Sequence, residues 1–129
     1  MNSLDGDTLL FFNEHSAALP IYEALEAVLH EKWPETKKRV QKTQITFYDR
    51  HVFACVSFQR VKRKAELPDP YLVLTLGLPY PLESQRVAVK SEPYSGRWTT
   101  HLVLGRPEEI HGELLAWIGE AYDVSQAKR

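Results

Sequence analysis

Three hydrogen-bonding side chains alternate along residues 94–105, at Arg97, Thr99 and His101. Successive residues of a β-strand point to opposite faces of the sheet, so these three side chains would share one face. A guanidinium can bind a carboxylate or phosphate through two parallel hydrogen bonds, and a neighbouring hydroxyl or imidazole can orient the bound group. This spacing predicts a surface that binds a small anionic ligand or a protein partner.

Lys42 and Gln44 have the same alternation in an earlier segment. If the first and last predicted strands lie close together at the centre of the sheet, all five side chains converge on one patch that suits an anion or a nucleotide-like ligand. The alternative is a face that is merely solvated. A third possibility is that an apolar residue there, such as Val73 or Val103, seals a homodimer.

Positive charge is concentrated in residues 36–64, which hold nine Lys and Arg and one acid, whereas the whole chain has a net charge of −1. This segment could bind single-stranded nucleic acid, with Tyr48 and Tyr71 as stacking surfaces. The opposing interpretation is that lysines on an outer strand discourage aggregation. The candidate contacts are Lys37, Lys38, Arg39, Lys62, Arg63 and Lys64.

No catalytic residue, metal site or cofactor is predicted. Cys55 lies in an apolar strand, where burial raises the pKa of a thiol and makes it inert. The five histidines and one cysteine show no HxxxH, HxH or CxxC spacing, and the glycines form no phosphate-binding loop. These observations favour a binding or accessory protein over an enzyme.

The elements that must position these residues follow from hydrophobic periodicity and turn signals. Residues 19–33 form an amphipathic helix from whose apolar stripe Glu23, Glu26 and His30 are excluded. We expect helices at 8–15, 19–33 and 107–122, and strands at 39–48, 51–59, 70–78, 85–92 and 97–104. Short connections between strands indicate antiparallel pairing. The prediction is a two-layer α+β fold, with an antiparallel meander of about five strands and three helices on one face.

The length of 129 residues is that of a single domain, with a core at about residues 8–123 and a frayed C-terminal tail. No apolar run reaches the roughly 20 residues that a membrane-spanning helix needs. The first residues carry acids where a secretory signal would carry Lys or Arg, and a single cysteine agrees with a reducing compartment. We expect a cytoplasmic protein that does not contact a membrane.

Several short runs together resemble a bacterial family described only as a domain of unknown function, some members of which are labelled "predicted transport protein". The runs are KTQITF, HVFACVSF, YLVLTLGL, SGRWTTHLVLG and LLAWIGEAY. The resemblance covers about residues 8–123 and implies helices packed on an antiparallel sheet. Similar domains occur alone or beside other modules, including nuclease-like ones, which implies a binding or accessory role. The transport label has no support in these residues, because they contain no membrane segment and no nucleotide-phosphate loop.

Overall fold

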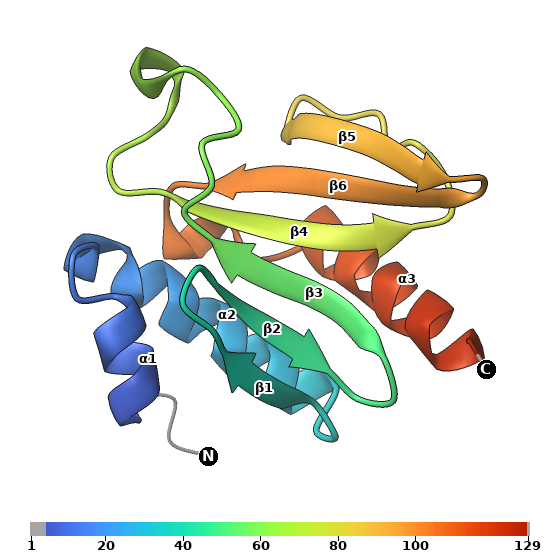
Figure 1. Cartoon of the computed structure of the whole chain (residues 1–129), viewed down its shortest axis with the longest axis horizontal. Coiled ribbons are helices and arrows are strands. Elements are labelled where there is room, and N and C mark those ends of the chain that lie inside the picture. Colours follow the sequence, from blue (N-terminus) through green and yellow to red (C-terminus); the bar gives the residue numbers. More distant parts are fainter. Residues whose placement is uncertain (1–4, 129) are drawn as a thin grey trace.

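A computed structural model describes residues 5–128 and shows a six-stranded antiparallel sheet (Figure 1). The strands are β1 (Lys37–Val40), β2 (Gln44–Tyr48), β3 (Val52–Ser57), β4 (Leu72–Leu78), β5 (Val87–Tyr94) and β6 (Arg97–Leu104). Their spatial order is β1-β2-β3-β4-β6-β5, so the last hairpin places β6 against β4 and leaves β5 at the edge. The predicted α+β fold is confirmed.

The helices α2 and α3 cover one face of the sheet, and α1 stands at the end of the strands where β1 finishes (Figure 1). The α-helices are α1 (Gly6–Phe11), α2 (Leu19–Lys32) and α3 (Glu113–Ala127). Single 3-10 turns lie at η1 (Ser16–Ala18), η2 (Lys64–Glu66) and η3 (Pro107–Glu109). The face away from α2 and α3 is called the open face below.

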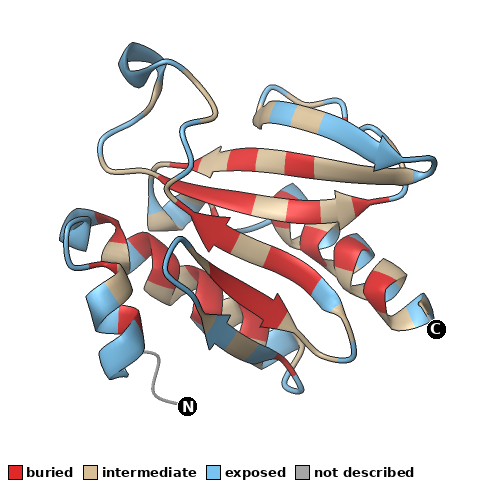
Figure 2. Cartoon of the chain, viewed as in Figure 1, coloured by how far each residue is buried: buried red, intermediate tan, exposed pale blue. Residues whose placement is uncertain are grey.

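Strand alternation sorts the sheet into a core face and an open face as predicted. Leu72, Leu74 and Leu76 are buried beneath the helices, with Ile21 and Leu25 of α2 among their neighbours in the core. Figure 2 shows the buried residues on the central strands and on the sheet-facing sides of α2 and α3, whereas much of β5 is exposed. Burial of each such side chain stabilises the fold by about 1.5–3 kcal/mol.

The first predicted strand is divided in the structure. Residues 41–43 form a tight connection between β1 and β2, closed by a hydrogen bond from the Gln41 amide to the Gln44 carbonyl (2.8 Å). The sequence QKT at this connection lacks the Gly, Pro or Asn that usually marks a hairpin, which is why one continuous strand was expected.

The C-terminal helix begins later and ends later than predicted. Gly112, at φ 58°, separates η3 from α3, and the positive φ explains a glycine there. Residues 124–127, predicted to fray, continue α3, because Ser125 is buried and Gln126 donates to the Asp49 carboxylate (3.2 Å). Residue 129 lies outside the described residues.

A buried carboxylate connects α2 to the edge of the sheet. Glu26 was expected outside the apolar stripe, but its side chain is only 1% exposed. The Tyr22 hydroxyl donates to Glu26 Oε2, and Lys38 Nζ lies 3.1 Å from the same oxygen. Burial and the neighbouring Glu26 carboxylate both raise the pKa of Tyr22, which keeps the hydroxyl protonated as a donor.

Lys38 also holds α1. Its ammonium group donates to Thr8 Oγ1 (2.7 Å) and lies 3.2 Å from Asp5 Oδ2. Asp5 caps α1 by accepting a hydrogen bond from the Thr8 amide (2.8 Å). One lysine therefore joins α1, α2 and β1.

We expect Lys38→Met to lower the free energy of unfolding by about 3–5 kcal/mol, because the buried Glu26 carboxylate would lose its cation. Urea denaturation followed by circular dichroism measures the change. Arg63→Met is the matched control, since Arg63 forms an exposed ion pair with Glu66 and should have no measurable effect. Equal stability of Lys38→Met and wild type would show that the pair does not hold the helices.

Candidate functional site

A continuous row of side chains crosses the open face from β2 to β6. Thr46 is opposite Cys55, Cys55 is opposite Thr75, and Thr75 is opposite His101. The Thr75 hydroxyl and His101 Nδ1 are 2.8 Å apart. Burial lowers the pKa of His101, which favours the neutral ring, and the tautomer of that ring decides whether Nδ1 accepts from or donates to the Thr75 hydroxyl.

The five predicted binding residues do not converge. Arg97, Thr99 and His101 lie together on β6, as their spacing predicted, but Gln44 is on β2 and Lys42 precedes it. Because β3 and β4 lie between β2 and β6, the two strands are roughly 14 Å apart, three interstrand spacings, and Arg97 lies a further six residues along β6 from Val103, the residue level with Gln44. The two groups occupy opposite sides of one face rather than a single patch.

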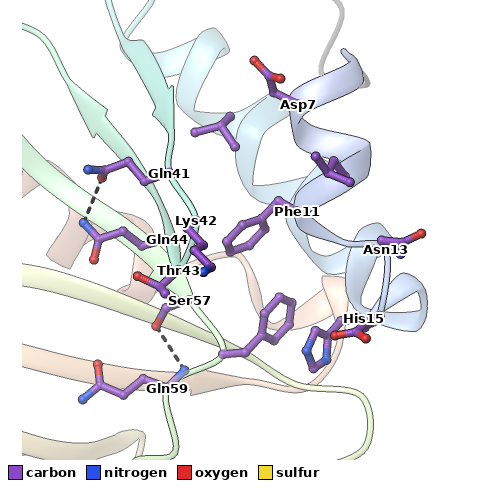
Figure 3. A pocket seen from close by; sticks show the side chains of 14 residues that line it. Asp7, Phe11, Asn13, His15, Gln41, Lys42, Thr43, Gln44, Ser57 and Gln59 are labelled. Carbon is purple, nitrogen blue, oxygen red and sulfur yellow. Dashed lines mark hydrogen bonds between the residues drawn. The ribbon is translucent and has the colours of Figure 1, made fainter.

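Lys42 and Gln44 instead line a groove of about 960 Å³ (Figure 3). One wall of this groove comes from α1 and the turn after it, between residues 7 and 15. The other wall comes from residues 40–44 of the β1–β2 hairpin and from residues 57–59 that follow β3. The groove thus lies between α1 and the ends of the strands.

Aromatic rings from the two walls of the groove are in contact with one another. Phe58 stacks on His15, with ring centroids 3.9 Å apart, and on Phe11 at 5.6 Å. In Figure 3 the Phe11 side chain projects from α1 toward the strands. These ring contacts join the end of β3 to α1 and make a rigid apolar wall.

The strand side of the groove is lined with amides. Gln41 Oε1 accepts from the Thr46 hydroxyl (2.8 Å) and from Gln44 Nε2 (3.3 Å), and Gln44 Nε2 also donates to Thr46 (2.9 Å). This network leaves Gln41 Nε2 as a donor and Gln44 Oε1 as an acceptor, both without a partner among residues 5–128. Figure 3 shows both amides turned away from α1.

The basic residues that were predicted to bind nucleic acid lie in three separate parts of the structure. Lys38 points under the helices, where its side chain is only 11% exposed, so its predicted contact with nucleic acid gives way to a structural role. Arg39 lies over the Tyr48 ring, 4.9 Å from its centroid, and shares the open face of β1 with Lys37. Lys62, Arg63 and Lys64 lie in the loop around η2, which extends beyond the strands away from β1 (Figure 1).

The open face also contains Cys55, Val73 and Val103. Cys55 is half-buried there rather than in the main core; burial raises the pKa of its thiol, and a hydrogen bond with Thr75 acts in the opposite direction. Val73, one of two residues considered for a homodimer contact, is fully buried within the chain and is not available, whereas Val103 is half-buried.

Among residues 5–128 no cluster of potential metal ligands is present, and no helix is both long and apolar enough to span a membrane.

Most of the groove has no local signal in the sequence. Phe11, His15 and Phe58 meet only after folding, because they come from the start of the chain and from the end of β3. Gln41 and Gln59 lie outside the strands and follow no alternation. Lys42 and Gln44 were identified for the open face, and their place in the groove depends on the unexpected hairpin.

We expect acid to weaken the contribution of His101 to stability. Its pKa is lowered from 6.5 in the folded protein, so below pH 6.5 the unfolded chain binds more protons and folding becomes less favourable. Wild type should therefore be more stable than His101→Gln by a constant amount above pH 7. This difference in unfolding free energy should shrink as the pH falls below 6.5. Urea titrations of both proteins from pH 8 to pH 5 measure it, and a difference that grows on acidification would contradict this assignment.

The comparison with protein families agrees with the resemblance seen in the sequence. The model of DUF5655, a domain of unknown function, matches residues 10–125, which include every helix and strand of the site except the first residues of α1. Neither a curated protein nor a solved structure matches the chain. The chain therefore belongs to the DUF5655 family of domains of unknown function.

Proposed function

We propose that this domain is a binding module that takes a small ligand in the groove beside α1 and carries out no chemistry of its own. The observation that carries the proposal is the groove itself, whose volume of about 960 Å³ lies within the range of small-molecule sites and whose lining includes the predicted Lys42 and Gln44. The sequence predicted that Lys42 and Gln44 bind a ligand at the centre of the open face, and in this proposal they bind it in the groove instead.

The lining has the mixture of groups that ligand sites use. Phe11 and Phe58 offer apolar contact, and the free donor of Gln41 and acceptor of Gln44, which are turned away from α1, can bind a polar group of the ligand on the strand side. Because the Gln41–Gln44–Thr46 network already holds these amides, a ligand would lose little entropy in ordering them.

The charges of the groove are mixed. Lys42 supplies one ammonium group, and Asp7 and Glu14 supply carboxylates from the helix side. A ligand with an apolar body, a hydrogen-bonding edge and at most a small net charge would fit this lining better than a polyanion. This is why nucleic acid is not the partner that we propose here.

The proposal is tested by screening a library of metabolites against ¹⁵N-labelled protein and following backbone amide shifts. We expect a hit to shift the amides of residues 41–44 and 57–59, and Lys42→Ala and Gln44→Ala each to weaken its binding by about 3- to 10-fold, the loss of one hydrogen bond. Lys32→Ala and Gln85→Ala are matched controls, because both side chains are exposed outside the groove.

The controls should bind as wild type does. The proposal fails if hits shift only residues remote from the groove, or if the Lys42 and Gln44 variants bind every hit as tightly as the controls. A library without any hit that shifts groove residues would also count against it.

A further inference from the structure

Gly77 interrupts β4 on the open face, at a position where a glycine weakens a strand. Its backbone leaves room for one particular group: a Cβ at this position would lie 2.5 Å from Nη2, 2.6 Å from Cζ and 2.7 Å from Nε of Arg97. Because these three atoms are almost equally distant, the guanidinium presents its flat face to the backbone of Gly77. The guanidinium of Arg97 therefore occupies the space that a side chain at position 77 would fill, and this space above the Gly77 backbone is called the seat below.

The seated guanidinium has no partner. Within residues 5–128 it makes no hydrogen bond and no ion pair, and its Nε atom is buried without an acceptor. A buried donor without an acceptor is costly, and such groups in native structures call for an explanation. A glycine in mid-strand and an unsatisfied guanidinium are two unfavourable features at one place.

The strands beside Arg97 carry hydroxyl and imidazole groups, and the Glu92 carboxylate of β5 accepts a hydrogen bond from the backbone amide of Gly96 (3.0 Å), the residue before Arg97. Thr99, two residues along β6, is opposite Gly77 on one side and Ser91 of β5 on the other. His101 follows on the same face with its hydrogen bond to Thr75. Neither β4 nor β6 contains an acidic residue.

We propose that Arg97, seated on Gly77, is an oxyanion site that takes a carboxylate or a phosphate group on the open face. The planar fork of the guanidinium suits either group through paired hydrogen bonds, and a bound oxyanion would supply the missing acceptors. The hydroxyl of Thr99 stands beside the seat as a further donor. This site lies across the sheet from the groove and does not depend on the function proposed for the groove.

The site is tested by titrating ¹⁵N-labelled protein with sodium phosphate and with sodium acetate at constant ionic strength, following the Nε–Hε resonance of Arg97. We expect a saturable shift of this resonance in wild type and its absence in Arg97→Gln. Arg97→Lys, which keeps the charge but loses the planar fork, should bind at least about 5-fold more weakly than wild type.

Gly77→Ala is the sharper variant, because it retains every charged group and displaces the guanidinium from its seat. We expect it to fold and to bind the oxyanion about 10-fold more weakly. Gly6→Ala is its matched control, since no atom lies within 4 Å of a Cβ placed there. Arg106→Gln is the control for loss of one exposed positive charge.

The results also distinguish the source of the oxyanion. Tighter binding of phosphate than of acetate indicates a phosphorylated small molecule, and tighter binding of a hexaglutamate peptide than of either indicates an acidic segment of a protein partner. The proposal is overturned if the Arg97 resonance does not move, if Arg106→Gln weakens binding as much as Arg97→Gln (an adventitious ion only), or if Gly77→Ala binds as wild type. If Gly77→Ala fails to fold, the comparison of Arg97→Lys with wild type decides in its place.

Discussion

The ion pair between Glu26 and Lys38 is the interaction on which the position of α1, and with it the groove, depends. Two opposite charges buried together lose their hydration, and the pair is stable only when further hydrogen bonds satisfy them. Tyr22 and Thr8 provide those bonds, one from α2 and one from α1. Six residues of helix could not hold a fixed place alone, so the wall of the groove that carries Phe11 is held in part by Lys38.

The order of the strands decides what the open face can do. With β3 and β4 between them, the amide-lined end near Gln44 and the guanidinium at Arg97 cannot act on one small ligand. The two ends also differ in chemistry: the groove combines aromatic rings with uncharged amides, whereas the seat on Gly77 holds a positive charge without a counterion. The face therefore has two chemically different regions, and the row from Thr46 to His101 lies between them.

The parts of the fold that the sequence predicted are those set by short-range periodicity. Alternation placed Leu72, Leu74 and Leu76 in the core and Arg97, Thr99 and His101 on the open face, because neighbouring residues of a strand must diverge. Two of the errors involved a partner far along the chain. Glu26 was predicted outside the apolar stripe, and the fold buries it because Lys38 lies beside it. The tail at Ser125 and Gln126 was predicted to fray, and the fold extends the helix there because Gln126 contacts Asp49.

The site was predictable to the same degree and for the same reason. Residue types selected Lys42 and Gln44, and on β6 Arg97, Thr99 and His101, but only the fold shows that the first two belong to a groove.

The edge strand β5 is locally irregular: its pairing with β6 shifts register twice, and Pro93 lacks a backbone donor. A strand from another molecule would find no regular ladder along β5, so this edge of the sheet resists recruiting further strands.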